Sequence, residues 1–305
     1  MTTSSLQTVA TLLPPHPPTA EGFLTGDQKE AYDRDGFIVL TELLGPGDLA
    51  GVREAMSEKV EAIAQDCLRR GLIPEPYADA PLESRLAKIA AHLTHDQFLE
   101  NGRSWRERRP GYFHLMSNPK VLNAVESLIG PELFANPVYN TRPKVPGHSA
   151  GAVPWHQDKS YWPDANSNPV ITVWIPVVDA TEQNGCLYVW PRTHKKRFLS
   201  YHAEQKSGTA YTQIDAEHLT RIEREQVALP VKAGSAILFN DRCVHMSTPN
   251  RSDTVRWSVD LRYQPTDQDP MPQHGAGFLA RSHKRPGAVA TLDDWLAERP
   301  EHAGG

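Results

Sequence analysis

The stretch Thr254–Tyr263, with the sequence TVRWSVDLRY, decides the fold of this chain. Its odd-numbered residues are apolar and its even-numbered residues are polar or charged, which is the period-two pattern of a β-strand. The apolar face must pack against other elements. A sheet backed by helices or a second sheet, with the polar face that carries Arg256 lining an internal cavity, would give this pattern.

Several shorter segments around this strand also have the composition of strands, and they begin only after Gly130. They are rich in β-branched and aromatic residues and are separated by turn residues. We expect strands at Leu133–Arg142, Val153–His156, Val170–Val178, Cys186–Trp190, Gln226–Val231 and Ala236–Phe239.

The part of the chain before Gly130 predicts helices instead. Thr25 and Gln28 form a capping-box pattern that starts a helix to about Arg34, and a short buried strand follows at Phe37–Leu40. Apolar residues spaced by three and four predict a long helix from about Asp48 to Arg70. Prolines make the first part of 71–110 a loop, and further helices are expected at 118–130 and 291–298.

This order of elements predicts a mainly β protein with flanking helices, built as a double-stranded β-helix of the jelly-roll, cupin-like kind. We expect one domain over residues 21–305, with a helical part at about 21–130, a β-helix core at about 131–265 and a C-terminal tail at 266–305. Residues 1–20 are rich in Thr, Ser and Pro and predict a disordered leader without a signal peptide.

Composition excludes several classes of protein. The chain has 305 residues and a formal net charge of −5, and no basic tract predicts a nucleic-acid or membrane partner. No apolar run has the length of a membrane span. The three cysteines form no CxxC pair, which indicates a reducing compartment, so we expect a cytoplasmic protein. Nothing in the sequence sets its oligomeric state.

A second motif has the residue types of a metal-binding site. His156-Gln157-Asp158 is expected on one strand, where alternation places the side chains of His156 and Asp158 on the same face, and His245 follows 89 residues after His156. Two imidazoles and one carboxylate can bind one face of an iron(II) ion and leave the other positions open. Arg256, on the polar face of the last strand, has the planar fork that matches a carboxylate.

Each of these residues also has a structural interpretation. A lone His-x-Asp seldom binds a metal, and the chain has 13 histidines. Arg256 could form a structural ion pair with Asp260 or Asp158. The presence of all three candidate ligands together with an inward-facing arginine favours the metal site.

The chain resembles the phytanoyl-CoA dioxygenase family of iron(II)/2-oxoglutarate oxygenases. The resemblance rests on the opening strand 34–40, on Trp155-His156-Gln157-Asp158, on the segment 184–195 and on His245-Met246-Ser247-Thr248-Pro249-Asn250 followed by Arg256. It runs from about Thr25 to Gln264. These motifs are specific in combination and weak singly.

The resemblance implies that His156, Asp158 and His245 bind iron(II) and that Arg256 binds the distal carboxylate of 2-oxoglutarate. It also implies co-substrate contacts for Ser247, Trp174 and Arg142, whose structural interpretations are a strand-cap hydroxyl, a core tryptophan and a surface cation. The implied reaction uses O2, releases succinate and CO2, and hydroxylates an unactivated C–H bond. Desaturation or ring formation could replace hydroxylation. A halogenase needs an open position where Asp158 stands, so halide transfer is not expected.

The substrate is less constrained. Tyr139, His148, Tyr161, Trp162 and Trp190 are candidate contacts, and each could equally be a core residue. Residues 68–109 could form a lid. No Lys/Arg cluster resembles a site for the phosphates of coenzyme A, so we expect a small metabolite or a natural-product scaffold. Two alternatives stay open: a cupin-like metal isomerase or hydrolase, for which Arg256 would have no use, and a non-catalytic binding member of the fold.

Overall fold

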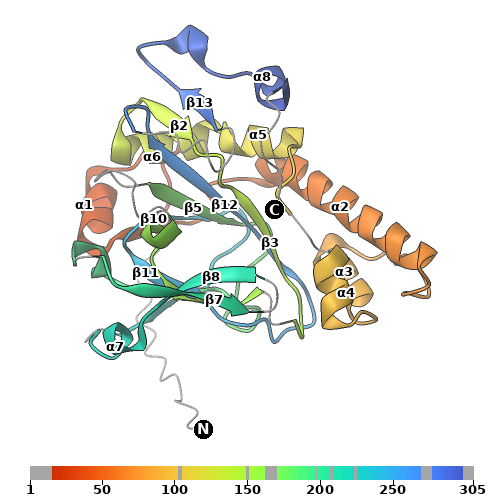
Figure 1. Cartoon of the computed structure of the whole chain (residues 1–305). Coiled ribbons are helices and arrows are strands. Elements are labelled where there is room, and N and C mark those ends of the chain that lie inside the picture. Colours follow the sequence, from red (N-terminus) through yellow and green to blue (C-terminus); the bar gives the residue numbers. More distant parts are fainter. Residues whose placement is uncertain are drawn as a thin grey trace.

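The structure is a computed structural model that describes residues 16–101, 105–148, 151–161, 170–196, 198–206, 209–222, 225–268 and 277–297. Two antiparallel sheets face each other, and helices cover the outer face of the larger one (Figure 1). This is the predicted jelly-roll arrangement. Of the leader expected over 1–20, residues 1–15 lie outside the described residues, and His16 forms a parallel bridge with Leu40.

The large sheet is built around β12, which spans Arg256–Pro265. One edge of β12 pairs with β5 (Ile171–Pro176), while its other edge pairs first with β3 (Asn140–Lys144) and then with β2 (Leu133–Ala135). The sheet continues outward through β10 (Ala236–Asn240) and β1 (Phe37–Leu40), and through β13 (Phe278–Arg281).

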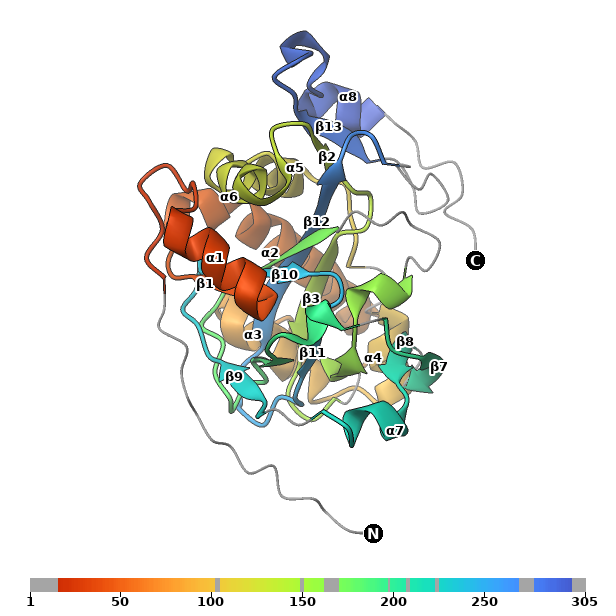
Figure 2. The ribbon, with the colours of Figure 1, turned by 90° about the vertical axis from the view of Figure 1, so that its left-hand side faces the viewer.

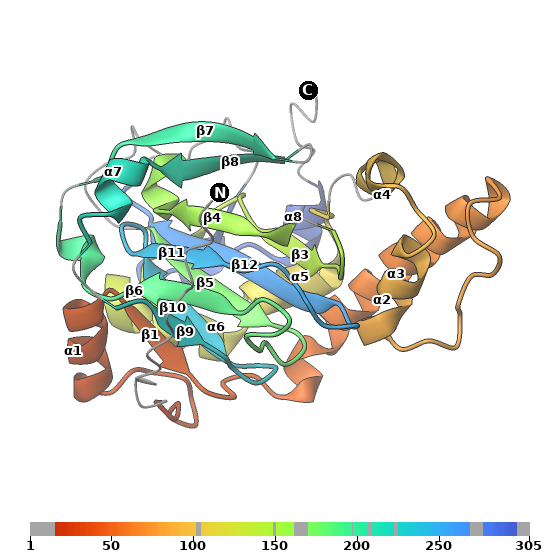
Figure 3. The same cartoon turned by 90° about the horizontal axis from the view of Figure 1, so that it is seen from below.

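The small sheet has the order β4-β11-β6-β9. Its strands are Val153–His156, Val244–Ser247, Leu187–Trp190 and Val227–Leu229. A separate hairpin of β7 (Tyr201–Lys206) and β8 (Thr209–Ile214) lies beside β4, as seen from below in Figure 3. The interior between the two sheets is therefore lined by the inward-facing residues of both.

The helices form where their caps and apolar spacing predict them. α1 (Gly26–Asp35) begins at Thr25 with a complete capping box and ends at Gly36, whose φ of 85° is the left-handed conformation that suits glycine. α2 (Pro46–Arg69) and α6 (Pro119–Ile129) also match the prediction, the latter with Asn118 as its N-cap. A short α8 (Leu292–Ala297) lies in the tail.

The helices pack against the apolar face of β12. Trp257, Val259, Leu261 and Tyr263 are at most 1% exposed and belong to one core cluster with the buried faces of α2, α5 (Pro110–Met116) and α6. Figure 2 shows β12 with α5 and α6 to one side of its upper part and the more distant α2 beyond it. Burial of such side chains contributes about 1.5–3 kcal/mol each, which fixes the register and turns the polar face inward.

The first part of 71–110 is a loop, as predicted, and α3 (Leu82–Ala90) and α4 (His95–Asn101) follow in the part for which no element was predicted. Elsewhere the prediction differs from the structure in three local respects. The segment expected as one strand at 133–142 is divided into β2 and β3. The β7–β8 hairpin, the short helix α7 (Ala216–Leu219) and β13 were not expected. Asp158 does not continue the strand of His156 but starts a 3-10 helix, Asp158–Tyr161.

None of the helices in the described part of the chain combines the length and the apolar composition that a membrane span requires. The three cysteines are free and buried, as expected for a chain without a disulfide framework.

Candidate metal and co-substrate site

Two neighbouring strands of the small sheet hold the two histidines. His156 on β4 and His245 on β11 are cross-strand partners, and their ring centroids are 4.2 Å apart. The Nδ1 atom of His156 lies 2.9 Å from the carbonyl oxygen of Pro154, and Nδ1 of His245 lies 2.9 Å from that of Cys243. Each Nδ1 therefore donates to a backbone carbonyl, which leaves both Nε2 atoms free to bind a metal.

Asp158 completes the set from the 3-10 helix. Its Oδ1 lies 3.4 Å from Nε2 of His156 and 4.0 Å from Nε2 of His245. One ligand atom from each of the three residues can be chosen so that all lie within 4.8 Å of one another. Burial, together with His156, lowers the pKa of His245 to about 4, so its imidazole is neutral at physiological pH and able to bind a metal.

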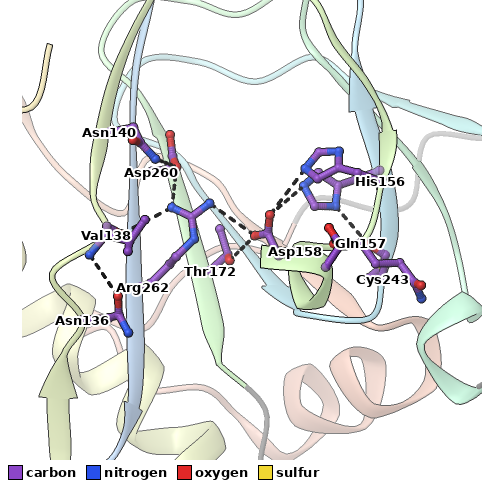
Figure 4. Close-up of polar contacts among 12 residues, drawn as sticks. Asn136, Val138, Asn140, His156, Gln157, Asp158, Thr172, Cys243, Asp260 and Arg262 are labelled. Carbon is purple, nitrogen blue, oxygen red and sulfur yellow. Dashed lines mark hydrogen bonds and ion pairs between the residues drawn. The ribbon is translucent and has the colours of Figure 1, made fainter. Parts of the chain in front are cut away.

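The second oxygen of Asp158 is bound by the large sheet. Oδ2 accepts hydrogen bonds from the hydroxyl of Thr172 and, at 3.5 Å, from Nη2 of Arg262 (Figure 4). Burial alone would raise the pKa of Asp158, but Arg262 and the two histidines hold it well below the ordinary value. The carboxylate is therefore charged, with Oδ1 directed at the histidines.

Arg262 also joins Asp158 to a second buried carboxylate. Its Nη1 donates to Oδ2 of Asp260 at 2.5 Å, and Asn140 donates to the same oxygen at 2.8 Å. The Nε of Arg142 donates to Oδ1 of Asp260 at 2.8 Å. These side chains come from β12 and β3, whose register places Arg142 opposite Ser258 and Asn140 opposite Asp260.

Arg256 lies on the same inward face but has a different environment. It is 2% exposed, its guanidinium lies 5.3 Å above the ring of Trp174, and it donates to the hydroxyl of Ser258. Among the described residues it has no carboxylate partner, and its buried Nε has no hydrogen-bond partner. The alternative of a structural ion pair with Asp158 or Asp260 is not what the structure contains, because Arg262 makes both of those contacts.

Lys144 is a site residue that the sequence analysis missed. It is 1% exposed, lies opposite Arg256 in the β3–β12 register, and donates to the hydroxyl of Ser247 at 2.7 Å and to the carbonyl of Thr248. Burial and the nearby Arg256 hold its pKa well below the ordinary value. Its position two residues after Arg142 in a strand was the available signal, because alternation places both on one face.

One pocket, called the metal pocket here, brings together all seven residues predicted for iron and co-substrate. It is lined by His156, Asp158, His245, Arg256, Ser247, Trp174 and Arg142, together with Thr172, Phe239, Asp260 and Arg262 among others. An iron(II) ion fits the two imidazole nitrogens and the carboxylate oxygen. A dicarboxylate fits the unpaired guanidinium of Arg256, because a buried cation without a partner is costly.

The residues predicted to contact substrate are more scattered. The ring of Tyr161 lies edge-on to that of His156 at 6.0 Å, and His148 lies against Phe98 at 4.3 Å. Tyr139 is buried away from the metal pocket, where its hydroxyl donates to the carbonyl of Glu107. Trp190 stacks on Trp155 at 3.9 Å and does not line the metal pocket. Trp162 lies outside the described residues.

Comparison with known proteins identifies the family. A family model described as phytanoyl-CoA dioxygenase (PhyH) matches residues 32–258. The chain belongs to the phytanoyl-CoA dioxygenase family. Its cofactors are iron(II) and 2-oxoglutarate, in agreement with the His-Asp-His cluster in the metal pocket.

Individual relatives within and around this family are distant. The human peroxisomal phytanoyl-CoA dioxygenase is 22% identical over 249 residues, which are 80% of this chain and 69% of that protein. The ectoine dioxygenase of Bordetella parapertussis is 25% identical over 297 residues, which are 91% of this chain and 85% of that protein.

Solved structures share the fold. The 2-oxoglutarate-dependent carbocyclase SnoK from nogalamycin biosynthesis superposes with a TM-score of 0.56 at 19% identity, covering 83% of this chain and 88% of that chain. EctD from S. alaskensis with bound Fe superposes with a TM-score of 0.53 at 21% identity, covering 82% of this chain and 80% of that chain. These likenesses confirm the predicted double-stranded β-helix.

Proposed function

We propose that this protein is an oxygenase that hydroxylates an unactivated C–H bond of a small metabolite or natural-product scaffold. The observation that carries the proposal is the pairing of a buried His156–Asp158–His245 cluster with a buried arginine that lacks a carboxylate partner in the described chain. A cupin-like metal isomerase or hydrolase that uses no 2-oxoglutarate would need the cluster but would have no use for Arg256.

Each side chain of the metal pocket has a role in this proposal. His156, Asp158 and His245 would hold iron on one face, with Arg262 and Thr172 fixing Asp158 so that Oδ1 faces the ion. Arg256 would bind the distal carboxylate of 2-oxoglutarate, beside Ser247 and Lys144. Iron(II) held by these residues would supply, with 2-oxoglutarate and O2, the oxidant for the C–H bond, and 2-oxoglutarate would be converted to succinate and CO2.

The surrounding residues would exclude water from the reacting groups. Phe239 stacks on His245 at 4.7 Å, and the ring of Trp174 covers the guanidinium of Arg256. Apolar walls strengthen the electrostatic contacts inside the pocket and protect reactive species from solvent. The protein's remaining task is to hold the substrate carbon near the open side of the metal.

The test is succinate formation across a panel of metabolites, with iron(II) and 2-oxoglutarate supplied under air. We expect one class of small substrate to stimulate succinate release and to gain one oxygen atom from isotopically labelled O2. Turnover restricted to acyl-CoA thioesters would contradict the proposed substrate class. A product that gains no oxygen would contradict hydroxylation. Failure to bind 2-oxoglutarate in the presence of iron would contradict the oxygenase itself.

A further inference from the structure

A second cavity, called the outer cavity here, shares one lining residue with the metal pocket, Arg142. Its cavity volume is about 170 Å³, against about 40 Å³ for the metal pocket. Room of this order is well above what a single water needs. It lies along β3, which is an edge strand paired only with β12 in the described sheet.

The walls of the outer cavity are largely apolar and aromatic. Phe98 and Leu99 of α4, Trp105 after it, and Val145 after β3 contribute apolar surface. His148 packs on Phe98, with ring centroids 4.3 Å apart. Figures 1 and 3 show α3 and α4 beside the same end of β3. Apolar walls with a few convergent polar groups are typical of a site for a small organic molecule.

Arg142 is the polar group placed to orient such a molecule. Its Nε is held by Asp260 at 2.8 Å, and Asp260 is itself fixed by Arg262 and Asn140 (Figure 4). Among the described residues, no hydrogen bond is made by the two terminal nitrogens of Arg142, and its side chain is 35% exposed. The guanidinium is thus anchored on one edge and leaves its two terminal N–H groups available to an acceptor.

The balance of charge favours an anion at this position. Four cationic side chains line the two cavities (Arg142, Lys144, Arg256 and Arg262), against the carboxylates of Asp158 and Asp260. Bound iron(II) would add two positive charges, and 2-oxoglutarate would remove two. The site stays positive even if burial, which lowers the pKa of Lys144, keeps that amine neutral. The described residues that line the outer cavity include no acidic side chain.

We propose that the outer cavity is the substrate site and that Arg142 binds a carboxylate of the substrate through its terminal nitrogens. The substrate class is then a small organic acid with an apolar or aromatic body, which packs against Phe98, Trp105 and His148 while its other end reaches the metal pocket. This inference rests on the proposed oxygenase function. It assigns Arg142 to the substrate, whereas the family resemblance implied a contact with the co-substrate.

The test compares carboxylic acids with their primary amides, using pairs such as 3-phenylpropionate and 3-phenylpropionamide, and aliphatic acids of similar length. Binding is measured anaerobically as the change that each probe causes in the visible absorption of the complex of the protein with iron(II) and 2-oxoglutarate. We expect at least one acid to bind at least tenfold more tightly than its amide. Wild-type protein without any such preference, including no binding at all, overturns the proposal.

Variants separate the role of Arg142 from that of the co-substrate. In Arg142→Met, the acid preference should fall at least tenfold, because hydrogen bonds to a charged group contribute about 1.5–3 kcal/mol. Arg142→Lys should restore part of it, since the charge returns without the fork. The matched control Arg69→Met, at a side chain 69% exposed on α2, should keep the full preference. Weaker 2-oxoglutarate binding in Arg142→Met, with acid preference retained, would assign Arg142 to the co-substrate and overturn the proposal.

Failure of the oxygenase proposal would look different. In that case the wild type would give no iron-dependent 2-oxoglutarate complex at all. The acid preference is then measured by ligand-observed NMR, which needs neither metal nor turnover. A preference that depends on Arg142 in that experiment would support the outer cavity as an acid site. Equal binding of acids and amides would contradict it.

Discussion

Arg256 and Arg262 lie on the same strand and face the same interior, yet their surroundings differ. Arg256 is 2% exposed and Arg262 is 5% exposed, so both guanidinium groups are removed from water. Arg262 pairs with Asp158 at 3.5 Å and with Asp260 at 2.5 Å. Arg256 has a serine hydroxyl and a tryptophan ring beside it and, within the described chain, no carboxylate.

The partners of Arg262 are part of the fold, whereas Arg256 has no carboxylate partner among the described residues. A buried cation costs several kcal/mol unless a partner compensates for its lost hydration. Arg262 has its partners within the fold, so its role is to position Asp158. Burial and the nearby Arg142 lower the pKa of Arg256 to about 10, which still leaves it charged at neutral pH. We infer that the missing partner of Arg256 is the dicarboxylate co-substrate.

The largest effect on turnover is expected at Asp158, the candidate metal ligand that Arg262 contacts. Asp158→Ala removes the carboxylate ligand and leaves two histidines, which do not hold iron(II) in a defined geometry. We expect turnover to fall at least about 1000-fold, which corresponds to about 4 kcal/mol in the activation free energy. Iron content after gel filtration and succinate formation measure the two effects.

The control for this variant is Asp66→Ala, which removes a carboxylate that is 40% exposed on α2 and pairs only with Arg69 and Arg70 among the described residues. Surface pairs of this kind contribute little, so iron content and turnover should stay at wild-type values. Retention of stoichiometric iron by Asp158→Ala would contradict the assignment of the metal ligands.

A second test removes the paired arginine. Arg262→Met leaves Asp158 buried beside Thr172 without its cation, so we expect the free energy of unfolding of the metal-free protein to fall by about 3–5 kcal/mol. Urea denaturation measures it. Added iron(II) should recover part of the loss, because the ion replaces the missing charge. A free energy of unfolding equal to that of Arg69→Met would show that the ion pair between Arg262 and Asp158 does not contribute to stability.

The opposite result is expected for the unpaired arginine. Arg256→Met should raise the dissociation constant of 2-oxoglutarate by about 10–100-fold, since charge-assisted hydrogen bonds contribute about 1.5–3 kcal/mol. Iron affinity should change less than about twofold. The ligand-free protein should be no less stable than the wild type, because the variant removes a buried charge with no carboxylate partner. Unchanged affinity for 2-oxoglutarate would contradict the proposal that Arg256 binds its distal carboxylate.

The contrast between these arginines could be predicted only in part. The alternation of Thr254–Tyr263 predicted that Arg256 and Arg262 face inward, because one face of the strand is continuously apolar. It could not predict which arginine would be paired. That depends on Asp158, which leaves its strand for a 3-10 helix, and on the register that sets β3 against β12. Both are tertiary features without a local sequence signal.

The substrate side was harder to predict for a related reason. Pro74, Pro76 and Pro81 indicated a loop, which the structure contains up to the N-cap of α3 at Pro81, but the helices that follow beside β3 were not predicted. The strand predicted over 133–142 stopped at Arg142, whereas β3 continues to Lys144. Lys144 was therefore not considered, although it is one of the most buried side chains.

The smallest expected effect concerns Asp260, the carboxylate that ties Arg262 to Arg142. Burial would raise its pKa, but the two arginines and Asn140 lower it to about 2 from the ordinary value of 3.8. A carboxyl group whose pKa is lower in the folded state stabilises the fold above about pH 4, and this contribution is lost as the pH falls toward 2. For this shift the contribution is about 2 kcal/mol.

Asp260→Asn should therefore be less stable than the wild type at pH 6, and the gap should narrow as the pH falls from 5 to 3. Urea denaturation of both proteins at each pH measures the gap, and Asp158, which is present in both, cancels from the difference. The same variant leaves the contacts of Arg256 with Ser258 and Trp174 in place, so the affinity for 2-oxoglutarate should change less than it does in Arg256→Met. A gap that stays constant across this range would mean that Asp260 does not titrate as an ion-paired carboxylate. The two ends of the strand would then differ less in their electrostatics than their contacts indicate.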